Sequence, residues 1–60
     1  MPSRRRRARI IALQTLYEAD TTGHEPLNIL ERLLRDALAT EEVAGFAREL
    51  VSGATEHREY

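Results

Sequence analysis

The sequence contains no cysteine, and only three glycines and two prolines occur among its 60 residues. Without cysteine, neither a disulfide nor a zinc–thiolate site can stabilise the chain. The glycines are isolated, so they do not form a phosphate-cradling loop. The longest apolar run, residues 10–13, is far too short to cross a membrane. These absences leave one small domain that depends on apolar packing for its stability.

Recognisable catalytic or metal-binding motifs are also lacking. The two histidines are not spaced as a metal-binding pair, and no pair of carboxylates converges for acid–base chemistry. No serine or threonine has a partner arrangement that would activate it as a nucleophile. The basic start is not followed by the long apolar region of a signal peptide. We therefore predict a cytoplasmic protein that is not an enzyme and holds no metal or cofactor.

Charge is distributed very unevenly along the chain. Residues 1–9 hold five arginines and no acid, a charge of +5, whereas residues 10–60 hold four arginines and ten acids, a charge of −6. The formal net charge of −1 hides this asymmetry. A basic arm on an acidic body indicates a polyanionic partner at one end.

Apolar residues recur at helical spacing in three segments, and no segment alternates with a period of two. This pattern predicts an all-α fold with helices over about residues 3–21, 26–38 and 41–58. No glycine, proline or other stop signal follows the third pattern. We therefore expect the chain to be truncated in mid-helix, as the first part of a larger helical domain.

Helix ends have clear signals. Ser3 and Thr40 are expected N-caps, and Gly23 suits the left-handed position after the first helix. Pro26 fits the first turn of the second helix, where its missing N–H is not needed.

Each predicted helix has an apolar stripe that is expected to face the core. In the first helix Ile10, Leu13 and Tyr17 form one line, with Ala12, Leu16 and Ala19 beside it. The second stripe contains Leu27, Leu30, Leu34 and Leu38, flanked by Leu33 and Ala37, and the third contains Val43, Phe46, Ala47, Leu50, Val51 and Ala54. Gly45 and Gly53 lie within the third pattern, where each costs about 1 kcal/mol relative to alanine. We expect one or both to permit close approach of a neighbouring helix.

The arginine-rich start is the strongest functional signal. On a helix, Arg5, Arg6 and Arg9 group together, whereas Arg4 and Arg7 point elsewhere. Cations at a helix N-terminus are unfavourable for the helix itself, so an external use is indicated. Arginine suits bidentate phosphate contacts and stacking on bases. Nucleic-acid binding is our hypothesis, and a solvated terminus that only aids solubility is the alternative.

An anionic membrane is a weaker explanation for the arginines. Membrane-surface helices carry Lys and Arg along a whole polar face. Here arginine is confined to the start, and Glu18 and Asp20 follow on the same predicted helix. Tyr17 has two interpretations, because its line with Ile10 and Leu13 predicts burial, whereas an exposed tyrosine could anchor a partner.

Three stretches together resemble the NusB family of bacterial transcription antitermination factors. They are RRRAR at residues 5–9, ALQTLYE at residues 12–18 and FARELVSGAT at residues 46–55. The resemblance covers nearly all of this chain but only about the first half of a family domain. It implies the three-helix N-terminal part of an all-helical NusB-like domain.

The resemblance also implies a function. Family members bind the boxA element of ribosomal RNA leader transcripts together with a small-subunit ribosomal protein, and they keep RNA polymerase from terminating early. Arg5, Arg6 and Arg9 fall where the family's RNA-contacting arginines lie, with Arg4 and Arg7 adding attraction. Tyr17 falls where a family tyrosine contacts the ribosomal protein.

Two other interpretations stay open at this point. The chain could be a helical protein-interaction module in which the arginines are incidental, or it could self-associate through uncovered apolar faces. The family's helical module also occurs at the N-terminus of ribosomal RNA cytosine-5 methyltransferases, so a fragment could come from one of these. Such a fragment would still be a binding module.

Overall fold

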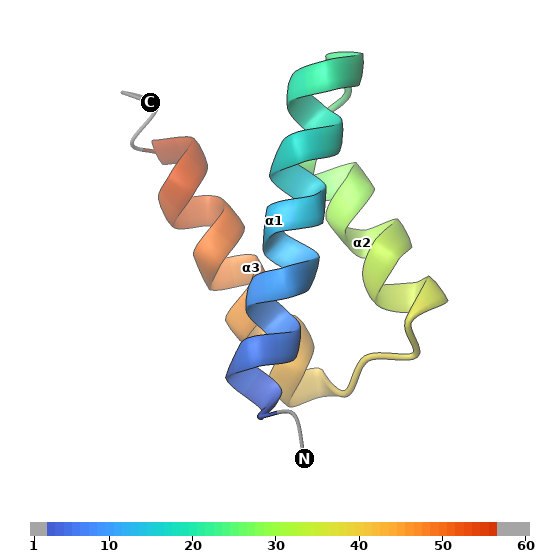
Figure 1. Cartoon of the computed structure of the whole chain (residues 1–60), viewed down its shortest axis with the longest axis vertical. Coiled ribbons are helices and arrows are strands. Elements are labelled where there is room, and N and C mark those ends of the chain that lie inside the picture. Colours follow the sequence, from blue (N-terminus) through green and yellow to red (C-terminus); the bar gives the residue numbers. More distant parts are fainter. Residues whose placement is uncertain (1–2, 57–60) are drawn as a thin grey trace.

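The computed structural model describes residues 3–56 and consists of three helices (Figure 1). They are α1 (Arg4–Thr22), α2 (Pro26–Asp36) and α3 (Glu41–Glu56). No strand occurs among the described residues, which confirms the predicted all-α class. The end predicted for the third helix, at residue 58, lies outside the described residues.

The α1 helix is the central element of the fold. It contacts both α2 and α3, which also contact each other. In Figure 1, α1 runs in front of the other two helices, with α2 on one side and α3 on the other. One face of α1 is therefore buried against its neighbours, and the opposite face is open to solvent.

The helix ends carry the capping contacts that the sequence predicts. The Ser3 hydroxyl oxygen accepts a hydrogen bond from the Arg6 N–H at 3.1 Å. Gly23 has a φ of 75° and donates its N–H to the Ala19 carbonyl at 2.9 Å. The Thr40 hydroxyl oxygen accepts from the Val43 N–H at 3.3 Å. These contacts satisfy backbone groups that a helix terminus leaves without partners.

The predicted end of the second helix, at residue 38, is wrong. Helix α2 ends at Asp36, and Leu38 has a φ of 53° and is 87% exposed. The N–H of Leu38 donates to the Arg35 carbonyl and that of Ala39 to the Leu34 carbonyl, as in a Schellman motif. The sequence does not signal this end, because the left-handed position that glycine usually takes is held by leucine.

The core-facing side of α1 also differs from the prediction. Ile10, Leu13 and Tyr17 are 48%, 62% and 74% exposed. Of the residues beside this line, Ala12 is buried and Leu16 is partly buried, as predicted. The other buried residues of α1 are Ala8, Ile11 and Thr15, which the stripe does not contain. Small side chains on this face let α1 pack against two helices at once, which apolar periodicity alone does not reveal.

Most of the predicted core of α2 and α3 is confirmed, and the exceptions lie at the edges of the stripes. Residues that are buried as predicted are Leu30, Leu34, Val43, Ala47 and Val51. Phe46 and Ala54 are only partly buried, Leu27 and Leu50 are about half exposed, and the expectation that Leu38 faces the core is wrong. The buried hydroxyl of Thr15 donates to the Ile11 carbonyl at 2.9 Å, so it leaves no unpaired polar group.

Among the ion pairs that connect the helices, two involve α2. Arg32 donates to both carboxylate oxygens of Glu18, at 2.8 and 2.7 Å, and so links α2 to α1. Arg48 donates to both oxygens of Glu31, at 2.8 Å each, and so links α3 to α2. This hydrogen bonding from Arg48 holds the pKa of the Glu31 carboxyl below its usual value. Because three of the four groups are exposed and Glu18 is only partly buried, each pair adds little to stability.

The expectation that glycine permits close helix approach is wrong for both glycines of α3. A Cβ atom added at Gly45 or Gly53 would meet no other heavy atom within 4 Å. Gly23 likewise has free space, but its positive φ disfavours any L side chain.

Replacing Gly45 with alanine is therefore expected to raise the free energy of unfolding by about 1 kcal/mol, the difference in helix propensity. Gly53→Ala should act in the same direction. Gly23→Ala is the control and should lower stability by about 1 kcal/mol, because its backbone is left-handed. Circular-dichroism melting measures all three, and a lower melting temperature for Gly45→Ala would contradict the open environment of this glycine.

Candidate nucleic-acid interface

The candidate interface is built on the first two turns of α1. Ser3 caps the helix, so the basic run is helical from Arg4 onward. The first turn contains no acidic residue. The positive end of the helix dipole therefore adds to the field of the arginines instead of being neutralised.

Arg4 and Arg7 are bonded within the molecule. An Nη1 of Arg4 lies 2.8 Å from a carboxylate oxygen of Glu42 on α3. Arg7 donates to the carbonyl oxygen of Ala37 at 3.4 Å. Both side chains thus brace the start of α1 against its neighbours and are less available to an external anion.

Arg5, Arg6 and Arg9 lie on a different side of α1. In the described part of the chain none of them forms an ion pair. The guanidinium carbon of Arg5 lies 5.5 Å from the centroid of the Phe46 ring, within cation–π range. We call these three arginines, which have no carboxylate partner within residues 3–56, the basic face of α1.

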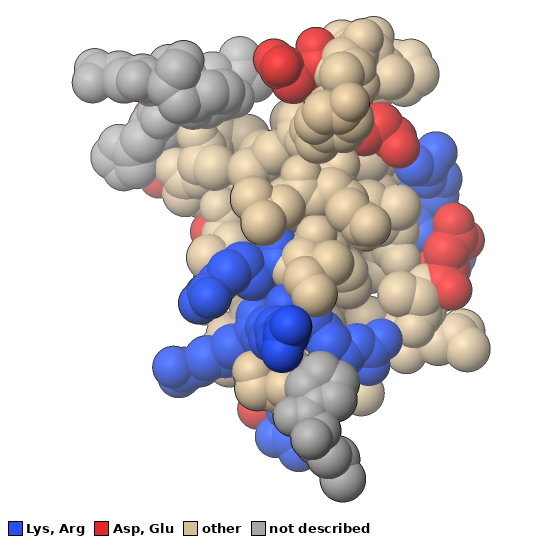
Figure 2. All heavy atoms as spheres, viewed as in Figure 1, with Lys and Arg blue, Asp and Glu red and all other residues tan. Residues whose placement is uncertain are grey.

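Figure 2 shows how charge is arranged on the side of the molecule that α1 occupies. Arginine side chains gather over the lower part of α1, and the surface above them is mostly uncharged. A localised cluster of cations beside a neutral surface is suited to a partner that has both phosphates and apolar groups.

A groove lies between the basic face and α3. It has a volume of about 190 Å³ and is lined by Arg5, Arg9, Phe46, Glu49 and Leu50. This groove was not predicted from the sequence, because Phe46 and Leu50 were expected to lie in the core. Both residues lie at one edge of the apolar stripe of α3, where a side chain is only half covered, and this position could have indicated their exposure.

The second predicted site, Tyr17, lies on the solvent side of α1. Together with Ile10 and Leu13 it forms the outer stripe of α1, whose side chains are 48–74% exposed. A hollow of about 310 Å³ next to it is lined by Gln14, Tyr17, Glu18, Thr21 and Leu33. Tyr17 is therefore exposed, so of its two interpretations the one that predicts burial is wrong.

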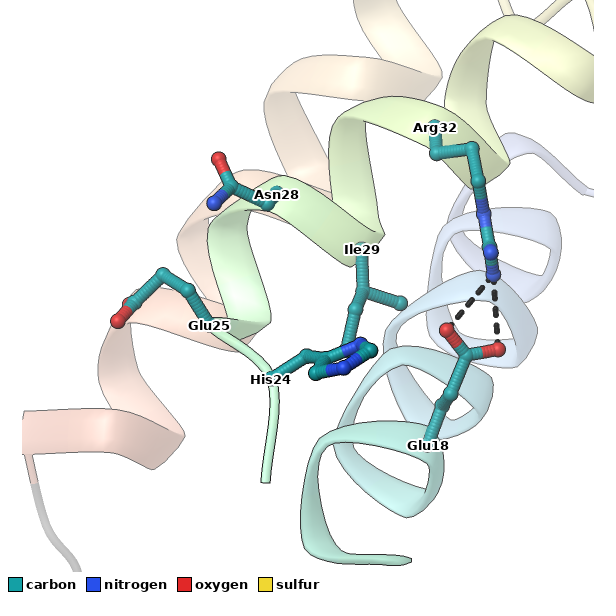
Figure 3. Close-up of a pocket in the computed structure, with 6 residues that line it drawn as sticks. All are labelled: Glu18, His24, Glu25, Asn28, Ile29 and Arg32. Atoms are coloured by element: carbon teal, nitrogen blue, oxygen red, sulfur yellow. Dashed lines mark hydrogen bonds and ion pairs between the residues drawn. The ribbon is translucent and has the colours of Figure 1, made fainter. Parts of the chain in front are cut away.

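Another hollow, of about 360 Å³, lies near the α1–α2 turn and is lined by Glu18, His24, Glu25, Asn28, Ile29 and Arg32 (Figure 3). The Arg32 guanidinium points onto the Glu18 carboxylate, so these two charges satisfy each other. Within residues 3–56, no group of three or more His, Cys, Asp or Glu side chains could hold a metal ion. The Arg32–Glu18 pair in this hollow is therefore not free to bind an external ligand, and the described residues provide no metal site there.

None of the described helices is both long and apolar enough to cross a membrane.

Comparison with known proteins gives consistent matches. The model of the NusB family matches residues 6–60. All 60 residues align with the transcription antitermination protein NusB of Chloroflexus aggregans at 48% identity and with that of Roseiflexus sp. at 47%. The chain spans 40% and 42% of the length of these relatives. No solved structure shows a significant match.

Proposed function

The chain belongs to the NusB family, and we propose that it is an RNA-binding part of a transcription antitermination factor. The observation that supports this most strongly is the basic face, where Arg5, Arg6 and Arg9 have no carboxylate partner among the residues that the structure describes. Arg4 and Arg7 supply a weaker, longer-range attraction. The ligand would be single-stranded leader RNA of the boxA type.

Several other features support this proposal. The relatives carry the name of transcription antitermination proteins, which agrees with a non-enzymatic role and favours such a factor over a methyltransferase fragment. The chain spans about two fifths of these relatives. We therefore propose that residues 1–60 correspond to the N-terminal helical part of a NusB domain. Action on nascent transcripts, beside RNA polymerase, would take place in the cytoplasm.

Fluorescence anisotropy with a labelled single-stranded boxA-type RNA tests RNA binding. Binding is expected at low salt, because phosphate contacts provide most of the affinity. A scrambled RNA of the same composition should bind within a few-fold, since such contacts carry no sequence information. Absence of binding to either RNA at low salt would contradict the proposal.

A second candidate function is a protein contact through the outer stripe of α1. Its support is the exposure of three large side chains, Ile10, Leu13 and Tyr17, on a single helix face. Exposed tyrosines beside apolar residues are common anchors of protein interfaces. The partner that we propose is the small-subunit ribosomal protein with which the family acts, and a second copy of this chain is the alternative.

Replacing Tyr17 with alanine is expected to weaken binding of this ribosomal protein about tenfold or more, as truncation of an interface anchor does. Affinity for RNA should stay within twofold, because the substitution changes no charge and lies outside the basic face. Isothermal titration calorimetry measures the protein contact, and analytical ultracentrifugation detects self-association. Equal binding by wild type and variant would exclude Tyr17 as the anchor.

A further inference from the structure

The groove between α1 and α3 has an unusual combination of chemical groups for a surface that attracts phosphates. Two arginines one turn apart, Arg5 and Arg9, form one wall. Phe46 and Leu50 present apolar surface from α3, and Leu50 is 44% exposed. A surface that bound phosphates alone would have no need of an aromatic ring or a leucine.

The Arg5–Phe46 contact resembles the platforms on which unpaired bases stack. The guanidinium lies over the ring at 5.5 Å, so a planar cation and an aromatic face adjoin at the groove. Bases splayed out of single-stranded RNA stack on both kinds of plane. The partial exposure of Phe46 leaves apolar surface that a base could cover.

Glu49 gives the groove a hydrogen-bond acceptor. It is exposed, and its side chain forms no hydrogen bond or ion pair within residues 3–56. A carboxylate repels a phosphate, but it accepts well from the amino group of cytosine. Uracil instead has a carbonyl oxygen on each side of its N–H, and a carboxylate repels these oxygens.

We propose that this groove holds one unpaired, amino-bearing nucleobase of the bound RNA, with cytosine preferred over uracil. The base stacks on the Arg5–Phe46 platform and donates its amino N–H to Glu49. The plane of the Arg5 guanidinium stacks on the base while its edge N–H groups, together with Arg6 and Arg9, contact the neighbouring phosphates. This inference rests on the proposed RNA binding and adds to it a chemical preference at one position.

Phe46→Trp provides a direct readout, because the sequence contains no tryptophan. Titration with a short oligocytidine should quench the fluorescence of the new indole, whereas oligouridine of equal length should quench it less at equal occupancy. Leu27→Trp, at the start of α2, is the control and should not respond. Anisotropy of labelled RNA, measured in parallel, reports occupancy independently.

Two further variants separate stacking from hydrogen bonding. Phe46→Leu keeps an apolar side chain but removes the ring, and should lower affinity by about 5- to 150-fold, the range for losing one stacked base. The dependence of RNA affinity on salt should be the same for Phe46→Leu as for wild type. Glu49→Gln should bring the ratio of oligocytidine to oligouridine affinity close to one. Circular dichroism verifies that each variant is folded.

The possible failures are distinguishable. If RNA binds but the Phe46→Trp fluorescence is unchanged, the proposal that the groove holds a base is wrong, while RNA binding stands. If no RNA binds at low salt, the proposed function and the base-binding groove fail together. Without RNA, the indole fluorescence could shift to the blue as protein concentration rises. This result would show that another protein surface covers the groove, and it would also contradict base binding there.

Discussion

Replacing Arg5, Arg6 and Arg9 together with alanine is expected to lower affinity for single-stranded RNA by about three orders of magnitude. A hydrogen bond to a charged group contributes roughly 1.5 kcal/mol, so three lost contacts remove about 4.5 kcal/mol. Each 1.4 kcal/mol corresponds to about a tenfold change in affinity. Fluorescence anisotropy at low salt measures the loss, and circular dichroism confirms that the helices persist.

A matched pair of double variants tests whether RNA affinity depends on the position of the positive charges or only on their number. Arg6/Arg9→Ala and Arg4/Arg7→Ala each remove two positive charges. The first should weaken RNA binding about 100-fold, by the same arithmetic. The second should weaken it less than about tenfold, because Arg4 and Arg7 are already bonded to Glu42 and the Ala37 carbonyl. Equal losses would mean that only the net charge matters.

Replacing Leu30 with alanine is expected to remove most of the stability of the fold. Leu30 is fully buried within the core shared by the three helices. Truncating a buried leucine costs about 2–5 kcal/mol, whereas a chain of this length has only about 3–9 kcal/mol in total.

Urea or thermal unfolding followed by circular dichroism measures the effect. The melting temperature of Leu30→Ala should fall by at least about 8 °C, given a loss of at least about 2 kcal/mol and roughly 4–8 °C per kcal/mol in small domains. Leu38→Ala is the matched control, because the same atoms are removed from a side chain that is 87% exposed. Its stability should stay within about 0.5 kcal/mol of wild type. Similar losses for both variants would contradict the assignment of the core.

The sequence predicts the helices better than it predicts their faces. Their existence follows from apolar spacing, and the caps at Ser3 and Thr40 follow from side chains that compete for backbone N–H groups. The inner face of α1 could not be predicted in the same way, because its buried residues are mostly small. Periodicity favours large apolar side chains, yet in α1 Leu13 is exposed and Ala8 is buried.

The candidate interface was predictable in part. Helical geometry separates Arg5, Arg6 and Arg9 from Arg4 and Arg7, and the structure gives the latter two their partners. The groove beside Phe46 was not predictable, because it depends on the position of α3 relative to α1. That position is set by tertiary packing between residues about 40 apart in the sequence, which local pattern does not encode.

The dependence of RNA affinity on salt tests the central claim most directly. If three arginines neutralise three phosphates of single-stranded RNA, log affinity should fall against log salt with a slope of about −2. The Arg5/Arg6/Arg9→Ala variant should have a slope close to zero, and Arg4/Arg7→Ala should stay near the wild-type slope. A flat response of the wild type, or the same slope in the triple variant, would contradict binding through the basic face.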